Sequence, residues 1–441
     1  MMVRVIHILY NIVAVPLLAC VYGLLVVFHK KTRKRFRGVR ASLHSPELKA
    51  LHSHTSVAWF HAASMGEFEQ AKPVIEALKA RNSSLKIVVS FSSPSGYEPQ
   101  RNYAAADAVM YLPFDSWWSM RALVQSLQPA VFVCIRYDLW WNLLFRLRLQ
   151  RVPVVLLNAT YTRSRILSAF PLRQIYHCLL RMCSVIQTAN EVEYKRFAEM
   201  QLNMQLNMKL NMKLISGTDT RYDRILATAR SEQQHEPWFE NFAGNALENS
   251  ANSVRPLVVA LGSVWHADRI QCGISEEFLA QNPHIRLLIV PHEIDEKTLA
   301  TWQEHIPECA RLSLLRASTI TPHFRHVLVD TMGELLRLYR HADVAYVGGG
   351  FGSGVHSVAE PAAYGIPVAC GPHTANSADV VRLSAHNGCR IVTGAQEFAL
   401  WLQSMNSALL REQVGAANKD ALEKAAGSTE TAVATINSYV R

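Results

Sequence analysis

The strongest constraint on the fold is a rhythm that occurs twice: short apolar runs alternate with longer stretches of helical periodicity. In the first half the runs are "VAWFHAA", "KIVVSFS", "AVMYLPF", "AVFVCIR", "VPVVLLNA" and "VIQTAN". In the second half they are "PLVVALGS", "IRLLIVPHE", "HVLVDT", "ADVAYVGGG" and "IPVACGP". Uniformly apolar runs of this length are typical of parallel strands covered on both faces. Each half therefore predicts a doubly wound, Rossmann-like α/β domain.

Length and composition set the boundaries of these parts. A chain of 441 residues is too long for one hydrophobic core. The Asn-, Ser- and Glu-rich residues 229–255 are predicted to be a linker. We expect an anchor and basic collar at 1–41, an N-terminal domain at 42–228 and a C-terminal domain at 256–441, whose last helix can pack back on the N-terminal domain. Two such domains are expected to face each other across a ligand-binding cleft.

The first segment of the chain is apolar enough for a membrane. Residues 5–28 contain no charged residue over 24 positions, which is a length that can span a bilayer. A signal peptide is the rival interpretation, but no small-residue cleavage site precedes the basic cluster that follows. We expect a retained membrane anchor, and the sequence leaves open whether it crosses the bilayer or lies along it.

Charge supports a membrane location. The net charge of +10 is concentrated directly after the anchor, in Lys30, Lys31, Arg33, Lys34, Arg35, Arg37 and Arg40. Such a cluster favours the cytoplasmic side of the inner membrane and attracts anionic headgroups. It borders an apolar span instead of an aromatic-rich face, so no nucleic-acid partner is expected. The eight cysteines include no close pair, which predicts neither a metal site nor a disulfide framework.

A four-residue tandem repeat, "MQLNMQLNMKLNMKLI" at 200–215, interrupts the first half. It places leucines at i, i+4 spacing, so we expect a helix extension that arose by local duplication.

The stretch "WFHAASMGEFEQAKP" at 59–73 contains a conspicuous acid, Glu67. Ser64 followed by Glu67 has the spacing of a capping box. Pro73 argues against a helix that begins at Ser64, because proline breaks or kinks a helix interior. If the helix begins near Lys72, Glu67 lies in the turn and is available for catalysis. The stretch alone leaves both roles open.

The second half ends several strands in loops suited to a phosphorylated ligand. Gly349 and Gly350 belong to a glycine-rich loop before an expected helix, where backbone N–H groups can approach an anion. Glu360, in the first turn of that helix, is placed to accept hydrogen bonds from ribose hydroxyls. Three further residues at strand ends can approach the same phosphate, namely Gly262, Ser263 and His292.

The motifs "FHAASMGE", "GTDTRYDR", "GSVWH", "PHE", "DTMGELLRLYRHADVAYVGGGF" and "GVHSVAEPAAYGIPVACGPHTANSADV" resemble, in order, those of the 3-deoxy-D-manno-octulosonic acid (Kdo) transferases of lipid A biosynthesis. The resemblance implies a GT-B fold, a membrane-associated cytoplasmic enzyme, CMP-Kdo as donor bound by the C-terminal domain, and a lipid A precursor (lipid IVA) as acceptor bound by the N-terminal domain. It also implies inverting transfer without metal or other cofactor. Glu67 falls on the catalytic glutamate, and the positions associated with CMP are Ser263, His292, Gly349, Gly350 and Glu360.

Some positions depart from the family pattern. Ser357 stands where asparagine is usual, which weakens one expected donor contact. Asp138 replaces a glutamate and is an acceptor-binding or structural acid. Residues 158–164 lack the usual arginine after Asn-Ala, a role that Arg163 can take.

Two other functions fit the same features. One is another GT-B glycosyltransferase or a nucleotide-sugar epimerase that uses the same phosphate-binding loop. The other is a membrane-tethered nucleotide-binding regulator without activity.

Overall fold

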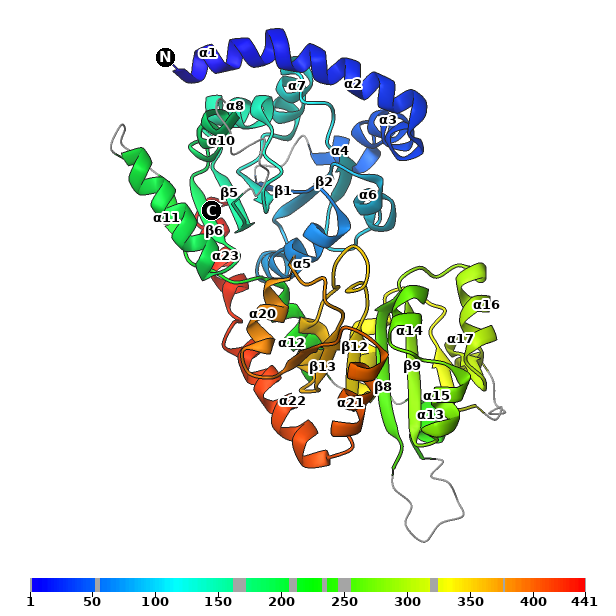
Figure 1. Cartoon of the computed structure of the whole chain (residues 1–441). Helices are drawn as coiled ribbons and strands as arrows, with labels where there is room; N and C mark the ends of the chain where they lie inside the picture. Colours follow the sequence, from blue (N-terminus) through cyan, green and yellow to red (C-terminus); the bar gives the residue numbers. More distant parts are fainter. Residues whose placement is uncertain are drawn as a thin grey trace. The chain divides into compact units, whose positions relative to one another are not determined.

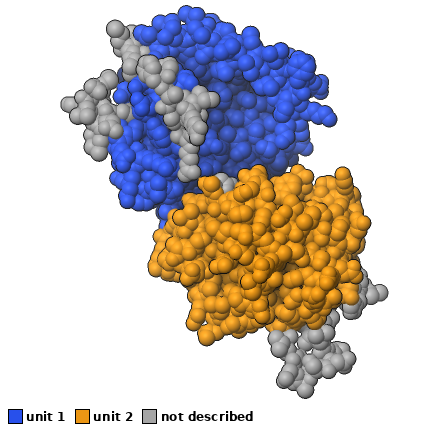
Figure 2. Space-filling view, in the orientation of Figure 1, with its two compact units in different colours: residues 1–223, 426–441 blue, residues 224–425 orange. Residues whose placement is uncertain are grey.

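The computed structural model describes residues 2–51, 56–161, 172–205, 212–231, 236–244, 255–317, 324–375 and 377–440. The chain forms two compact units, one of residues 1–223 and 426–441 and the other of residues 224–425 (Figure 2). We call them unit 1 and unit 2. All eight cysteines are free thiols.

Unit 1 is built on a seven-stranded parallel sheet in the order β3-β2-β1-β4-β5-β6-β7 (Figure 1). Its strands are β1 (Val57–Ala62), β2 (Lys86–Phe91), β3 (Ala108–Tyr111), β4 (Val131–Ile135), β5 (Val154–Ala159), β6 (Val185–Thr188) and β7 (Lys213–Ile215). The six predicted runs are all strands. The seventh, β7, was not predicted and pairs with β6 at the edge.

Helices cover both faces of this sheet. One face packs on α5 and α23 through a core that includes Phe68, Ile75 and Ile436, and the other packs on α7, α8 and α10. The helices of unit 1 are α1 (Met2–Leu9), the π-helical turn η1 (Tyr10–Ala14), α2 (Val15–Phe28), α3 (Lys30–Leu43), α4 (Pro46–Ala50), α5 (Met65–Arg81), α6 (Pro94–Gln100), α7 (Trp117–Leu127), α8 (Trp141–Leu149), α10 (Leu172–Leu180), α11 (Glu191–Gln205) and α23 (Ser428–Asn437). Helix α12 (Arg221–Arg230) crosses from unit 1 into unit 2.

Unit 2 repeats the design with a seven-stranded parallel sheet in the order β10-β11-β9-β8-β12-β13-β14. Its strands are β8 (Leu257–Val264), β9 (Ile285–Pro291), β10 (Cys309–Arg311), β11 (His326–Leu328), β12 (Val344–Val347), β13 (Val368–Cys370) and β14 (Cys389–Ile391). All five predicted runs are strands, and the two edge strands β10 and β14 were not predicted. The two doubly wound sheets confirm the predicted fold class.

The helices of unit 2 are mostly short. They are α13 (Pro237–Gly244), α14 (His266–Gln271), α15 (Glu276–Gln281), α16 (Glu296–His305), α17 (Leu312–Ala317), α18 (Leu335–Leu338), the 3-10 turn η3 (Tyr339–His341), α19 (Ala359–Ala363), α20 (Ala378–Ser384), α21 (Ala395–Ser404) and α22 (Ala408–Glu423).

The domain limits differ from those expected. Residues 2–41 belong to unit 1, because α3 packs along β3 and Ser42 Oγ accepts a hydrogen bond from the Tyr111 N–H at 3.1 Å. Within the expected linker, α13 buries Trp238 and Phe242 in the core of unit 2. As expected for the last helix, the chain returns to unit 1 at residue 426, and α23 packs on α5 of that unit.

The repeat is a helix only in part. Its first residues continue α11 to Gln205, whereas Lys213–Ile215 form β7, so the expectation of a helix to residue 215 is wrong. Edge pairing with β6 satisfies the backbone there. Residues 206–211, and also Arg163, lie outside the described residues.

Candidate active site

Each sheet has one point where the strand order reverses. In unit 1 it lies between β1 and β4, and in unit 2 between β8 and β12. Doubly wound sheets bind ligands beyond the carboxyl ends of the strands at such a switch point, because the loops on either side lead away in opposite directions. Most of the residues predicted for the site follow these four strands.

Glu67 lies in the first turn of α5, directly after β1, and is buried with 5% of its surface exposed. The helix begins at Met65 and not near Lys72, so Glu67 is helical. Packing of the buried side chains of α5 maintains the helix through Pro73. The Glu67 carboxylate accepts a hydrogen bond from the Ala63 N–H at 2.5 Å, whereas the N-cap Ser64 makes no side-chain capping bond. This is not a capping box, in which the acid accepts from the N–H of the N-cap residue itself.

A polar cluster lies beside Glu67. Asp138, which follows β4, lies with its Oδ2 2.9 Å from Nε2 of His61, the buried histidine of β1. Ser92, which follows β2, donates to the same oxygen at 2.7 Å. The other ring nitrogen of His61, Nδ1, lies 2.9 Å from Ser90 Oγ. The carboxyl ends of three neighbouring strands thus carry one connected network.

The pKa values of Glu67 and Asp138 are shifted in opposite directions. Burial raises the pKa of Glu67, and the nearby Asp138 charge adds to the rise, against the Ala63 N–H and the charges of Arg136 and His61. Burial also acts to raise the pKa of Asp138, but hydrogen bonds from His61 and Ser92 outweigh it and leave that pKa below its usual range. Carboxyl groups whose pKa values are pushed apart in this way are typical of acid–base sites.

His61, Ser92 and Arg136 were not predicted for this cluster. His61 stands inside the quoted motif "FHAASMGE", and all three follow or end predicted strands. Arg136 has a positive φ of 66°, which is uncommon outside glycine and marks a constrained turn after β4. Strand-end position was the signal that could have identified them.

The "GTDTRYDR" motif stabilises unit 1 through hydrogen bonds. Thr220 receives a hydrogen bond from the Asn158 side-chain amide at 2.7 Å and donates to the carbonyl of Gln70 on α5 at 2.5 Å. Gln70 in turn donates to Asp219 at 2.8 Å. These bonds hold α5, and with it Glu67, against the end of β5.

The glycine-rich loop of unit 2 is formed by close backbone approaches. Gly349 has a φ of +88°, and a Cβ there would lie 2.5 Å from the Gly354 carbonyl oxygen. A Cβ on Gly350 would lie 2.6 Å from the Gly371 nitrogen. Only glycine fits both positions, because both are buried and the loop backbone packs directly against neighbouring backbone.

Asp268, a residue that was not assigned a role, holds this loop in place. Its buried carboxylate accepts hydrogen bonds from the Gly349 N–H at 3.1 Å, the Trp265 N–H at 2.8 Å and the Tyr346 hydroxyl at 3.0 Å. The ends of β8 and β12 are thereby tied together. Gly262, in β8, accepts from the Gly348 N–H at 2.9 Å and leaves no room for a side chain beside Tyr339.

Aromatic rings line the same edge of unit 2. His292 stacks on His356 with ring centroids 4.4 Å apart, and its other neighbour is Trp265, also at 4.4 Å. Burial and the neighbouring His292 lower the pKa of His356. Within the described residues, His356 Nε2 and Ser357 Oγ are buried without a hydrogen-bond partner. Buried polar atoms of this kind are expected where a ligand supplies the partner.

Two residues predicted for the donor site, Glu360 and Ser263, have local structures that differ from those expected. Glu360 lies in the first turn of α19, a helix of only five residues, so a helix dipole contributes less than expected. The acid is close enough to Tyr339 and Tyr364 to act on their pKa values. Ser263 has a φ of +52°, a strained position at the end of β8.

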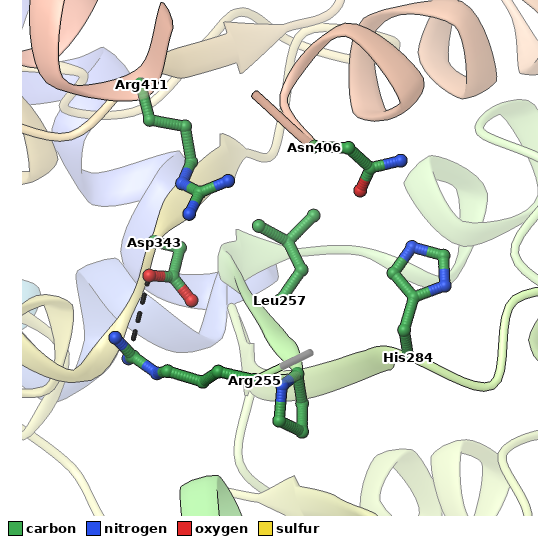
Figure 3. Close-up of a pocket in the computed structure, with 7 residues that line it drawn as sticks. Arg255, Leu257, His284, Asp343, Asn406 and Arg411 are labelled. Atoms are coloured by element: carbon green, nitrogen blue, oxygen red, sulfur yellow. Dashed lines mark ion pairs between the residues drawn. The ribbon is translucent and has the colours of Figure 1, made fainter. Parts of the chain in front are cut away.

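A cavity of about 370 Å³ lies at the opposite edge of the unit 2 sheet, near the beginnings of β8, β9 and β12 (Figure 3). It contains an ion pair between Arg255 and Asp343, with a nitrogen–oxygen distance of 3.6 Å. None of the residues predicted for the donor lines it. Over the described ranges no group of three or more His, Cys, Asp or Glu side chains is arranged to hold a metal ion. A metal-free reaction stays a prediction.

Comparison with known proteins supports one family. The family described as 3-Deoxy-D-manno-octulosonic-acid transferase (kdotransferase) matches residues 30–215. The 3-deoxy-D-manno-octulosonic acid transferase of Haemophilus influenzae is 24% identical over 437 residues, which cover 96% of each chain. That of Bordetella pertussis is 27% identical and covers 74% of this chain and 73% of its own. These matches, which together extend over most of the chain, support a Kdo transferase.

Solved structures show the same fold. The UDP-GlcNAc 2-epimerase of Neisseria meningitidis has a TM-score of 0.58 at 14% identity and covers 87% of this chain and 100% of its own. MurG of Acinetobacter baumannii has a TM-score of 0.51 at 12% identity and the same coverage. These likenesses support the GT-B fold of two Rossmann-like domains. The matches to Kdo transferases support glycosyltransferase activity.

Proposed function

We propose that this protein transfers Kdo from CMP-Kdo to a lipid A precursor, lipid IVA, in lipopolysaccharide biosynthesis, with inversion at the anomeric carbon. Glu67 is the general base. The observation that carries this proposal is Glu67 itself, which is buried at the switch point of unit 1 beside a hydrogen-bonded acid and has a raised pKa. The likeness to Kdo transferases supports the sugar and the pathway.

The chemistry is a single displacement. The acceptor hydroxyl oxygen forms a bond to the anomeric carbon of Kdo while Glu67 takes the hydroxyl proton. The bond between that carbon and the phosphate oxygen breaks, and CMP leaves with the electron pair. Inversion in one step requires no covalent nucleophile. A base whose pKa lies above that of an ordinary carboxyl group takes a proton from a hydroxyl more effectively, provided that it is ionised at the working pH.

Asp138 and His61 support this base. The hydrogen bonds to Asp138 keep that acid ionised, and its charge contributes to the raised pKa of Glu67. Asp138 is also 19% exposed at its side chain, so it can accept a hydrogen bond from a sugar hydroxyl. We assign it to acceptor binding.

Unit 2 supplies the donor site in this proposal. The backbone around Gly349 and Gly350 approaches the phosphate of CMP-Kdo, and Glu360 accepts hydrogen bonds from the ribose. His292 and Ser263 lie at neighbouring strand ends. The buried Ser357 Oγ, which lacks a partner among the described residues, is a ready donor or acceptor for the nucleotide.

We place the reaction at the cytoplasmic face of the inner membrane. Among the described residues, Val5–Phe28 is the one helix long and apolar enough to cross a membrane, with a mean hydropathy of 2.4. The basic residues that follow favour the cytoplasmic side and anionic headgroups.

The deciding experiment is Glu67→Gln, measured by transfer from CMP-Kdo to a lipid A precursor. Glutamine keeps the size of the side chain and can still accept from the Ala63 N–H, but it cannot take a proton. We expect the rate to fall by roughly 10² to 10⁴ while CMP-Kdo binding persists. Glu76→Gln, an exposed position on the same helix, is the matched control and should retain full turnover.

Turnover of Glu67→Gln within a few-fold of the parent would return Glu67 to a capping role. The same assay separates the alternatives: an epimerase would change a nucleotide sugar without an acceptor, and an inactive regulator would bind CMP-Kdo without forming product.

A further inference from the structure

The apolar N-terminal helix exposes a row of apolar side chains, which we call the apolar stripe. It follows α1, η1 and α2 over about 36 Å at 1.5 Å per residue. Its members are Val5, Ile8, Leu9, Ile12, Val13, Leu17, Leu18, Val21, Leu24, Leu25, Val27 and Phe28. In α1 and η1 the polar residues His7, Tyr10 and Asn11 lie half-buried on the side of unit 1, whereas α2 is exposed over most of its circumference. A helix surrounded by lipid has no reason for the division seen in α1 and η1.

The inward polar residues are fastened to unit 1. The Tyr10 hydroxyl donates to the buried carboxylate of Asp115 at 2.9 Å. Asn11 and Asn142 exchange hydrogen bonds between their side-chain amides at 2.9 and 3.0 Å, and Asn142 is fully buried. Asp115 also accepts the first backbone N–H groups of α8, from Asn142 and Leu143, at 3.0 Å each. The helix is therefore tied to the start of α8.

His7, one helical turn before Asn11, makes further contacts with α8. Its ring stacks on Phe145 of α8 with centroids 3.9 Å apart and planes at 10°. Its Nδ1 lies 3.2 Å from the indole Nε1 of Trp141, a residue that is 2% exposed. We use the term polar clasp for His7, Tyr10 and Asn11 together with their partners Asp115, Trp141 and Asn142.

The second half of the segment also follows unit 1. Tyr22 of α2 lies 5.9 Å from Phe114, centroid to centroid, and Arg35 of α3 donates to the Leu112 carbonyl at 3.0 Å. Figure 1 shows α1 and α2 as one long helix that runs over α7 and α8. Both halves touch the same side of the unit.

A spanning orientation would break these contacts. A helix that crosses the bilayer would carry the side chains of His7, Tyr10 and Asn11 into hydrocarbon, where each unsatisfied polar group costs several kcal/mol. Trp141 and Asn142, now buried, would lose their cover. An orientation along the membrane keeps the clasp intact and leaves the apolar stripe free for acyl chains.

We propose that residues 5–28 lie in the plane of one membrane leaflet, clasped to unit 1, instead of crossing the bilayer. The occupant of the apolar stripe is a lipid leaflet that carries anionic headgroups. Charge complementarity supports this choice, because α3 follows the stripe directly and presents exposed cations, namely Lys30, Lys31, Arg33, Lys34, Arg37 and Arg40. Interfacial helices with these two properties bind anionic membranes. The inference rests on the membrane location proposed above and not on the reaction.

The test compares which membrane side two cysteines face. In full-length protein carrying Cys20→Ser, one variant adds Met2→Cys and a matched control adds Gln125→Cys, an exposed position on α7 of unit 1. Intact spheroplasts and inverted vesicles from expressing cells are treated with a membrane-impermeant maleimide. We expect both cysteines to react from the same side. Reaction of the two from opposite sides would show a spanning helix and overturn the proposal.

The clasp is tested in the same assay. Asn11→Leu removes the partner of the buried Asn142 and makes the segment more apolar, so part of the population should move residue 2 to the opposite side. Ile12→Leu, on the outward face, should leave the labelling unchanged. An unchanged pattern in both would overturn the role of the clasp.

Lipid choice is tested with purified parent protein and vesicles of phosphatidylcholine, with or without phosphatidylglycerol. We expect co-sedimentation to increase at least tenfold with the anionic lipid and to fall with added salt. Protein that binds neither vesicle, or that forms dimers through the stripe instead, would overturn the lipid as occupant and with it the proposed membrane location.

Discussion

The carboxyl edges of the two sheets occupy the same topological position and differ in what they present. In unit 1 the edge carries titratable side chains joined in one network, with Glu67 buried beside Asp138 and His61. In unit 2 the edge carries glycines whose backbones touch, and Asp268 is turned inward to hold them. In the proposed reaction, the same fold thus supplies the base at one site and binds the donor at the other.

This difference has a physical basis. A base needs its charge partly desolvated, which requires bulky neighbours around it. A phosphate needs N–H groups that no side chain covers, which requires the absence of Cβ atoms. The two requirements conflict at a single sheet edge. With two sheets, one edge can surround the base and the other can bind the phosphate.

The largest expected effect on unit 2 comes from Glu360→Ala. Loss of hydrogen bonds to a charged acceptor should weaken CMP-Kdo binding by about 1.5–3 kcal/mol, measured by calorimetry, with little change in the rate at saturating donor. Glu412→Ala, at an exposed position on α22, is the control. The opposite pattern, intact affinity and a reduced rate, would place Glu360 with the chemistry and erase the contrast with Glu67.

Gly350→Ala tests the close backbone approach. Its Cβ would lie 2.6 Å from the Gly371 nitrogen, so one strand end must move, and overpacking of this kind costs about 1–3 kcal/mol of unfolding free energy. Gly352→Ala in the same loop meets only the Gly349 carbonyl oxygen at 3.7 Å and should change stability by less than about 0.5 kcal/mol. Equal stabilities of the two variants in denaturant unfolding would show that the loop can accommodate a Cβ atom at residue 350.

The sequence was informative where a signal is local. The central strands could be predicted because most of them contain an apolar run, whereas β7, β10 and β14 are three-residue edge strands that each carry a lysine or arginine. The start of α5 was missed because local proline chemistry argued against a helix that tertiary packing maintains.

The site was predictable in its parts and not in its connections. His61 and Asp138 are 77 positions apart, and only the strand order brings them together. The partners of the N-terminal helix are also distant in the sequence, as with Tyr10 and Asp115, which are 105 positions apart. The composition of residues 5–28 predicts that they contact lipid. Whether the helix crosses the bilayer or lies along it depends on those distant partners.

The smallest effect, and the most direct test of the two roles of Glu67, is the pH dependence of stability. A cap held by the Ala63 N–H and the start of α5 would lower the pKa of the carboxyl group, whereas burial raises it above 4.5. A raised pKa in the folded state means that folding favours the protonated acid. Its stabilising contribution is present below the unfolded pKa and is lost as pH rises through the folded pKa.

Comparison of the parent with Glu67→Gln isolates this group, since the other titrating groups are common to both. We expect the parent to lose unfolding free energy relative to the glutamine variant as pH rises from 4 to 8, measured as the shift in urea midpoint. The rate of transfer should fall on the acid side at a higher pH than for an ordinary carboxylate, because the base must be ionised to work. A parent that instead gains stability over the variant with rising pH would reveal a lowered pKa, and with it a cap and not a base.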